Sequence, residues 1–222
     1  MELVLDTADL DAIKDLDQLL NVAGVTTNPS IIAKSGKQPE EVINGLVEYL
    51  RPDQTLFVQT VQTSYEGILE EARAICGLRD KNTYVKIPCT HNGLRAIKAA
   101  KAEGLNVLAT AIYSADVAFM AALNGADYLA PYVNRMCNYG DGIEQVTDLL
   151  TMLERAGMAT KVLAASFKNV YQVHELLLAG IQAVTIPPSV AYGLVDHPGI
   201  PVAVDQFSAD WEHAFGRTTL FA

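Results

Sequence analysis

Short apolar segments alternate with longer amphipathic segments along the whole of this 222-residue chain. The short segments are rich in Val, Ile, Leu, Ala and Thr and are bounded by polar or turn-forming residues, a pattern typical of buried strands. Strands are therefore predicted at residues 2–5, 24–27, 55–60, 83–87, 106–111, 128–133, 161–165 and 183–186.

The longer segments repeat apolar residues every three or four positions, and this spacing predicts helices. Thr7 and Ser114 are candidate N-caps, whereas Gly104 and Gly125 stand where two helices are expected to end. The helices are predicted at about 10–19, 40–50, 64–78, 92–103, 114–124, 142–156, 170–179 and 189–196.

Eight strand–helix units without an intervening linker predict one (β/α)8 barrel, a TIM barrel that spans residues 1–222 as a single domain. An open doubly wound sheet is the alternative, because local patterns do not show whether a sheet closes. No GxGxxG motif follows the first strand, which disfavours a dinucleotide-binding version of that sheet. A final helix at about 199–216 carries Phe207, Trp211 and Phe215 at intervals of four. This aromatic stripe either closes the barrel floor or contacts a neighbouring subunit.

Composition and charge narrow the possible partners. Half of the residues are hydrophobic and the formal net charge is −10, which disfavours nucleic acid as a partner. No segment approaches the roughly 20 apolar residues of a membrane span, and acidic residues interrupt any signal-like run near the start.

Cys76, Cys89 and Cys137 are widely spaced, which favours free thiols in a cytoplasmic protein. The four histidines show no zinc-like spacing, so no metal site is predicted.

Lys86 is the most informative residue of the chain, because it lies within an apolar strand that ends at Pro88. Burial of a lysine disfavours its charged form and lowers its pKa. A neutral amine in a cleft attacks carbonyl carbon, which is the basis of Schiff-base chemistry. The alternative is a lysine at a sheet edge whose ammonium group reaches water.

Polar residues stand near the C-terminal ends of seven consecutive predicted strands, the end at which (β/α)8 barrels carry their active sites. Singly, each has an ordinary structural explanation, such as a helix cap for Asp6 or core packing for Tyr132. Their coincidence at one end favours a functional site. The candidates are Asp6, Thr26, Asn28, Gln59, Lys86, Thr110, Tyr132, Arg135, Ser166 and Lys168.

Five of these candidates suit the chemistry of a lysine adduct. Asp6 beside Lys86 would orient the amine and assist proton movements around a carbinolamine. Gln59, Thr110 and Tyr132 would hold a water molecule or donate hydrogen bonds, which permits proton transfer without a strongly charged base.

The other five candidates suit substrate binding. Arg135, Ser166 and Lys168 would hold a phosphate, combining a fork-shaped cation, a hydroxyl group and backbone amides at a helix N-terminus. Thr26 and Asn28 lie at the end of the second strand and are the remaining substrate-binding candidates.

At these residues the chain resembles the fructose-6-phosphate aldolase group of the transaldolase family, and the resemblance runs nearly end to end. Several long motifs occur in the same order, which makes the resemblance specific. They are Leu5–Thr7, Gly24–Ser30, Val85–Pro88, Ala130–Arg135, Leu163–Lys168 and Ala214–Arg217.

The resemblance implies a class I aldolase with its Schiff-base lysine at Lys86 and with no metal or organic cofactor. Such enzymes cleave fructose 6-phosphate to dihydroxyacetone and glyceraldehyde 3-phosphate, so the expected partners are sugar phosphates and hydroxyketones. They also form homo-oligomers, often a pentamer or a decamer of two stacked pentamers, in which the C-terminal helix reaches a neighbour.

Two alternatives for the function follow from the same motifs. Transaldolases typically carry glutamate at the position of Gln59 and phenylalanine at that of Tyr132, so both residues here favour a lyase over a transferase. A sugar-phosphate binding protein without catalysis is the other alternative, and the intact set of Asp6, Gln59, Lys86 and Tyr132 argues against it. Residues 136–142 depart from the family's glycine-rich loop, which bears on acceptor specificity.

Overall fold

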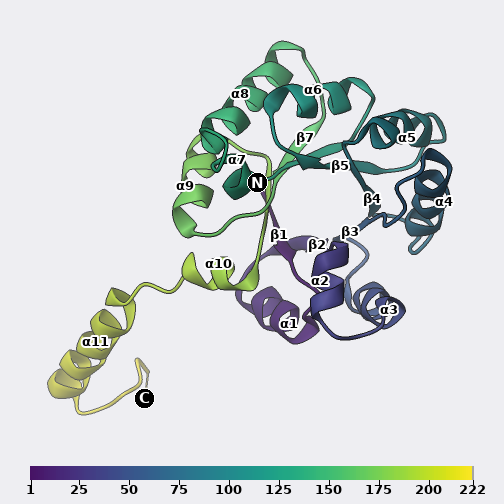
Figure 1. Ribbon diagram of the computed structural model, residues 1–222. Coiled ribbons are helices and arrows are strands. Elements are labelled where there is room, and N and C mark those ends of the chain that lie inside the picture. The colour runs from purple at the N-terminus through teal and green to yellow at the C-terminus, as the bar shows by residue number, and fades with distance from the viewer. Residues whose placement is uncertain (222) are drawn as a thin grey trace.

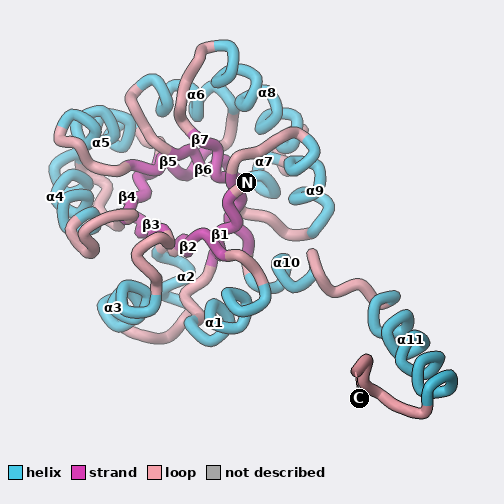
Figure 2. The backbone as a smooth tube through the Cα atoms, turned by 180° about the vertical axis from the view of Figure 1, so that it is seen from behind, coloured by secondary structure: helices cyan, strands magenta, loops and turns pink. Residues whose placement is uncertain are grey.

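A closed barrel of eight parallel strands forms the centre of the computed structural model, which describes residues 1–221 (Figure 1). Each strand pairs with the next along the chain, and β8 pairs with β1 to close the ring. Figure 2 shows this ring of strands from behind, with helices around it. The predicted (β/α)8 barrel is therefore confirmed over the open sheet. The strands are β1 (Glu2–Asp6), β2 (Val22–Thr26), β3 (Thr55–Gln59), β4 (Thr83–Pro88), β5 (Val107–Ile112), β6 (Tyr128–Pro131), β7 (Lys161–Ala164) and β8 (Ala183–Ile186).

The helices follow the predicted order, with two short additions. These are α2 and α7, which follow β2 and β6 and are too short for a helical period to mark them in the sequence. The predicted strand at 128–133 is correspondingly too long. The helices are α1 (Leu10–Leu19), α2 (Pro29–Lys34), α3 (Pro39–Tyr49), α4 (Tyr65–Cys76), α5 (His91–Ala102), α6 (Ala115–Leu123), α7 (Val133–Met136), α8 (Gly142–Arg155), α9 (Val170–Leu178), α10 (Pro188–Gly193) and α11 (Gly199–Phe215).

The helix ends show which capping predictions were right. Ser114 caps α6 as predicted, because its side chain accepts a hydrogen bond from Val117 N. Gly104 and Gly125 adopt positive φ angles just beyond α5 and α6, a conformation that glycine adopts without strain. The prediction for Thr7 was wrong: Asp9 caps α1, and Thr7 Oγ1 accepts a hydrogen bond from the Asp9 backbone instead.

Two apolar layers hold the barrel together. The larger lies between the strands and the helices, and the smaller fills the inside of the ring. Inside the ring the side chain of Phe57 lies against Tyr84 and Tyr128, with ring centroids 5.2 and 5.3 Å apart. Because side chains alternate between the two faces of a strand, the residues two positions further along also point into the ring. This alternation places the candidate site directly above an aromatic floor.

The last helix, α11, stands off the barrel in both views (Figure 1 and Figure 2). None of its residues is buried, and the rings of Trp211 and Phe215 pack against each other at 4.5 Å. The aromatic stripe therefore does not close the barrel floor, which was one of its two predicted uses. Among the helices of residues 1–221, none is long and apolar enough to cross a lipid bilayer.

Candidate active site

Strand alternation brings five of the predicted residues above the aromatic floor of the barrel. Gln59 follows Phe57 by two positions on β3, and Lys86 follows Tyr84 by two positions on β4. The register pairs Gln59 directly with Lys86 across these strands. The same rule applies to the remaining three, which lie at the ends of β1, β5 and β6. They are Asp6, Thr110 and Tyr132.

Lys86 is buried at the end of β4, with 4% of its surface exposed. Its Nζ donates a hydrogen bond to the backbone carbonyl of Thr27 at 2.7 Å. Burial lowers the pKa of Lys86 below its ordinary value of 10.5, and the negative charge of nearby Asp6 opposes that shift only in part. The first turn of α5 packs closely on the end of this strand, because a side chain at Gly93 would collide with the carbonyl of Pro88. The amine is therefore held in place by backbone and is biased toward its neutral form.

Asp6 is held by a chain of hydroxyl groups instead of by the lysine. Its carboxylate accepts a hydrogen bond from Thr26 Oγ1 at 2.7 Å, and Thr26 Oγ1 is also 2.7 Å from Thr185 Oγ1. Asp6 forms no ion pair with Lys86 within residues 1–221, so the expected direct orientation of the amine by Asp6 is not seen. The carbonyl of Thr27 does that instead. The sequence could not reveal this partner, because it is a backbone atom.

Among the ten candidate residues, Gln59 has a buried side-chain oxygen, Oε1, without a hydrogen-bond partner within the described residues. Thr27, whose carbonyl accepts from Lys86, also has a buried and unpaired side-chain oxygen. Buried polar atoms are almost always paired, so unpaired ones in a site are available to a ligand or to water. Gln59 thus offers an acceptor at the place where the sequence predicted a water-holding residue.

Tyr132 connects the proton-handling and phosphate-binding predictions. Its hydroxyl lies 3.2 Å from Thr110 Oγ1, which donates to it. The guanidinium of Arg135 lies over its ring, 4.8 Å from the centroid. Arg135 Nη1 also donates a hydrogen bond to the hydroxyl of Tyr113 at 3.1 Å. Tyr113 was not predicted, although it lies just past β5, where the strand-end rule would have found it.

A cavity of about 520 Å³ opens at this end of the barrel and collects eight of the ten predicted residues. Thr26 and Thr110 are not among its lining residues, since both are fully buried. Their hydroxyl groups act on Asp6 and Tyr132 instead. The predicted residues in the lining are Asp6, Asn28, Gln59, Lys86, Tyr132, Arg135, Ser166 and Lys168.

Two residues of the cavity wall have backbone conformations that are unusual for residues other than glycine. Ala111 has φ 56° and Ser166 has φ 63°. Each such residue costs on the order of 1–3 kcal/mol, and such strain clusters at functional sites. Ala111 lies where the β5–β6 register shifts, between Ala109 and Ile112. The wall is thus shaped by a local irregularity of β5 and not by an ideal strand.

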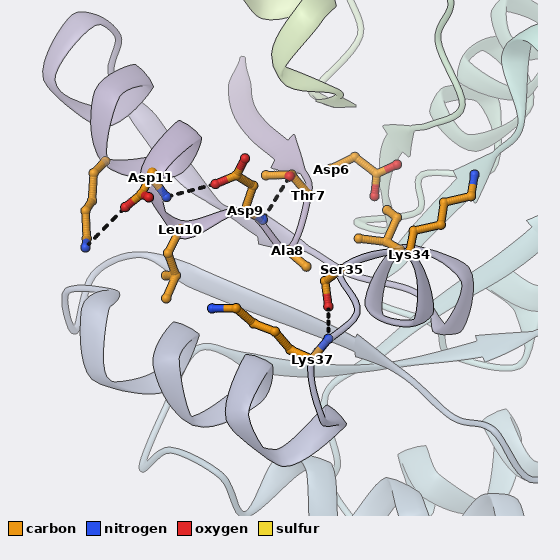
Figure 3. Close-up of a pocket in the computed structure, with 11 residues that line it drawn as sticks. Asp6, Thr7, Ala8, Asp9, Leu10, Asp11, Lys34, Ser35 and Lys37 are labelled. Atoms are coloured by element: carbon orange, nitrogen blue, oxygen red, sulfur yellow. Dashed lines mark hydrogen bonds and ion pairs between the residues drawn. The ribbon is translucent and has the colours of Figure 1, made fainter.

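A second pocket, of about 680 Å³, lies beside the first between the β1–α1 loop and α2 (Figure 3). The two pockets share Asp6, Ile31 and Lys34. The second is larger, but it does not reach Lys86 or Tyr132, and the polar groups drawn in it largely bond to one another, as in the hydrogen bond from Asp9 N to Thr7 Oγ1. The cavity with the buried amine is therefore the candidate active site.

A (β/α)8 barrel with a buried amine of lowered pKa at its polar mouth defines a class of protein suited to carbonyl chemistry. The chain matches the family described as Transaldolase/Fructose-6-phosphate aldolase over residues 3–219, and it belongs to that family. It is therefore an enzyme of the aldolase/transaldolase type, from a family that binds sugar phosphates.

Solved structures agree on the fold. One is titled "Native KDPGal structure" and is 17% identical, with a TM-score of 0.58, over 83% of this chain and 82% of that one. Another is a cube-shaped, highly porous protein cage designed by fusing symmetric oligomeric domains. It is 16% identical, with a TM-score of 0.62, over 97% of this chain and 78% of that chain. At these identities the likeness concerns the fold alone.

Proposed function

We propose that this enzyme is a class I aldolase that reversibly cleaves fructose 6-phosphate to dihydroxyacetone and glyceraldehyde 3-phosphate. The observation that carries the proposal is Lys86, a buried amine of lowered pKa in the same cavity as the exposed cation of Arg135. Membership of the transaldolase/fructose-6-phosphate aldolase family supports it.

The reaction begins when the neutral amine of Lys86 attacks the C2 carbonyl of the sugar. The carbinolamine loses water to give an iminium ion, which accepts the electron pair of the C3–C4 bond when that bond breaks. Glyceraldehyde 3-phosphate leaves, and the enamine that remains takes a proton at C3. Water then hydrolyses the iminium ion, which releases dihydroxyacetone and regenerates the amine.

Tyr132 and Gln59 are assigned to the proton transfers of this cycle. Cleavage requires a base to accept the C4 hydroxyl proton, and the enamine later requires a proton donor. The Tyr132 hydroxyl accepts a hydrogen bond from Thr110, which fixes its position and leaves its own proton to be donated. The unpaired Gln59 Oε1 would hold the water that relays these protons.

The phosphate is assigned to Arg135, Ser166 and Lys168, which line one side of the cavity. Asp6 and Asn28 line it as well and are assigned to the donor hydroxyl groups. Asn28 also caps α2 through its Oδ1, which accepts from Ile31 N and so fixes the side chain. Thr26 then acts by holding Asp6 and not by touching the substrate.

The test of lyase against transferase is product analysis with fructose 6-phosphate, with and without erythrose 4-phosphate. Free dihydroxyacetone and glyceraldehyde 3-phosphate without an added acceptor support the aldolase. Turnover that appears only with erythrose 4-phosphate and yields sedoheptulose 7-phosphate would make the enzyme a transaldolase. No turnover in either case, together with no borohydride-trapped adduct of dihydroxyacetone, would indicate a binding protein.

We also propose that the enzyme is a cytoplasmic homo-oligomer in which α11 packs on a neighbouring subunit. The support is the set of exposed apolar side chains on a helix that stands off its own barrel, which are Ile200, Val202, Val204, Phe207 and Phe215. Light scattering after size-exclusion chromatography tests this, with Phe207→Glu as the disrupting variant. A wild-type monomer would contradict the proposal.

A further inference from the structure

Tyr113 contacts two residues to which the proposed reaction assigns separate tasks. Its hydroxyl oxygen accepts a hydrogen bond from Arg135 Nη1 at 3.1 Å. Its ring lies edge-on to that of Tyr132, with centroids 5.7 Å apart. The guanidinium of Arg135 in turn lies over the Tyr132 ring, so each of the three side chains touches the other two. All three line the cavity that holds Lys86.

The orientation of Arg135 depends on these two tyrosines. Arg135 is exposed and forms no ion pair within residues 1–221, and an exposed arginine otherwise has considerable rotamer freedom. The guanidinium lies over the Tyr132 ring and donates to the Tyr113 hydroxyl, and the two contacts together restrict its orientation. The hydrogen bond to Tyr113 is also the largest cause of the raised pKa of Arg135.

The hydrogen bond to Tyr113 occupies one of the three nitrogen atoms of the Arg135 guanidinium. A guanidinium binds a phosphate most strongly through two parallel N–H groups. Because Nη1 donates to Tyr113, the edge formed by Nε and Nη2 remains, and neither of these atoms has a hydrogen-bond partner within the described residues. These two parallel donors thus stay unoccupied on a residue that lines the same cavity as Ser166 and Lys168.

We propose that Tyr113 is a positioning residue that holds the Nε–Nη2 edge of Arg135 toward the substrate phosphate and thereby sets the preference for phosphorylated acceptors. The acceptor reaction in this inference rests on the proposed function, whereas the phosphate site can be tested without turnover. Tyr113 touches Arg135 and not the reacting atoms, so its loss affects phosphate binding more than chemistry.

The chain offers a matched pair of variants. Tyr113→Phe keeps the ring and deletes only the oxygen that accepts from Arg135. Tyr171 on α9 is 63% exposed and does not line the cavity. Its hydroxyl makes no hydrogen bond within the described residues, so Tyr171→Phe deletes the same atom without affecting Arg135.

Isothermal titration calorimetry with glycerol 3-phosphate measures the site directly. We expect the wild type and Tyr171→Phe to bind alike, and Tyr113→Phe to bind about five- to tenfold more weakly, the usual effect of one hydrogen bond. Equal binding by Tyr113→Phe and the wild type would overturn the inference. Absence of binding to the wild type would overturn it as well, because there would be no phosphate site to position.

Kinetics separates positioning from a general structural role. In aldol addition of dihydroxyacetone, Tyr113→Phe should raise the KM for glyceraldehyde 3-phosphate about five- to tenfold. Its kcat, and its KM for unphosphorylated glyceraldehyde, should stay within about twofold of the wild type. Equal losses with both aldehydes would contradict a positioning role. If the wild type makes no aldol product, the proposed function fails, and calorimetry still decides the role of Tyr113.

Discussion

The same strands build the floor and the mouth of the barrel, and the two levels are two residues apart along each strand. They differ in how completely their side chains find partners within the protein. At the floor, Phe57, Tyr84 and Tyr128 contact one another, and the Tyr128 hydroxyl donates to Glu2 at 2.9 Å. At the mouth, Lys86 is buried without an ion pair and Gln59 Oε1 has no partner within residues 1–221.

This difference indicates that the two levels of each strand have different roles. The floor contributes apolar burial and aromatic contacts, which stabilise the fold. The mouth contains groups that destabilise the folded chain but are free to react, which is the arrangement expected of functional sites. If this is correct, substitutions at the mouth should reduce activity without loss of stability, and substitutions at the floor should do the reverse.

The largest effect is expected for Lys86→Met. Loss of the nucleophile should lower turnover by roughly 10⁴-fold or more, because the covalent route is removed. The control is Lys98→Met, which removes an exposed lysine from α5 and should leave activity unchanged. Turnover is measured with fructose 6-phosphate, and near-normal activity of Lys86→Met would rule out the Schiff base.

The same variant should be more stable than the wild type at neutral pH. The pKa of Lys86 is lowered in the folded chain, so between that lowered value and 10.5 the unfolded chain binds more protons than the folded one. The free energy of unfolding therefore rises with pH in this window, and the destabilising cost is largest below it. Lys86→Met should remove this cost and this pH dependence in thermal unfolding, whereas Lys98→Met should not.

Phe57→Ala should have the next largest effect, which should be a loss of stability. Removal of a fully buried phenylalanine costs about 3–5 kcal/mol in unfolding free energy. Urea denaturation measures this loss. Below the unfolding transition the variant should still form the borohydride-trapped adduct with dihydroxyacetone. A stable but inactive Phe57→Ala would show that the floor takes part in chemistry and would contradict the distinction between floor and mouth.

Gln59→Leu should show the opposite pattern two residues away. It removes an unpaired buried acceptor and inserts an apolar group of similar size, so stability should be unchanged or higher. Turnover should fall by about 10²-fold, the lower range for loss of a proton-transfer partner. Loss of stability with normal turnover would mean that Gln59 is an ordinary core amide.

Thr26→Val should have the smallest of these effects and should affect both properties. It deletes the hydroxyl between Asp6 and Thr185, which costs about 1 kcal/mol in stability. Turnover should fall several-fold because Asp6 is no longer held. Thr26→Ser keeps the hydroxyl and should restore turnover. If Thr26→Ser is as impaired as Thr26→Val, the methyl group matters and not the hydrogen bond to Asp6.

Much of this architecture could be predicted from the sequence. Eight alternating strand and helix segments predict the (β/α)8 barrel, and the alternation of side chains along a strand places Gln59 above Phe57 and Lys86 above Tyr84. Strand ends were placed to within a few residues, and the α11 prediction of about 199–216 agrees with Gly199–Phe215.

The rest depended on three-dimensional detail that residue types do not encode. The partner of Lys86 is the backbone carbonyl of Thr27, and Thr26 is a fully buried residue that holds Asp6 and does not line the cavity. The short helices α2 and α7 are set by local capping and by the end of β6, not by a helical period. Tyr113 lies one residue past β5, where a bulge shifts the register.

The most direct test of the central claim is the pH dependence of borohydride trapping. Wild-type enzyme is incubated with dihydroxyacetone at a series of pH values, and the adduct on Lys86 is measured by peptide mass spectrometry. Because burial lowers the pKa of Lys86, the rate of adduct formation should rise with pH, with a midpoint below 10.5, and reach a plateau above that midpoint. No adduct on Lys86, or a midpoint at or above 10.5, would contradict a buried, neutral nucleophile.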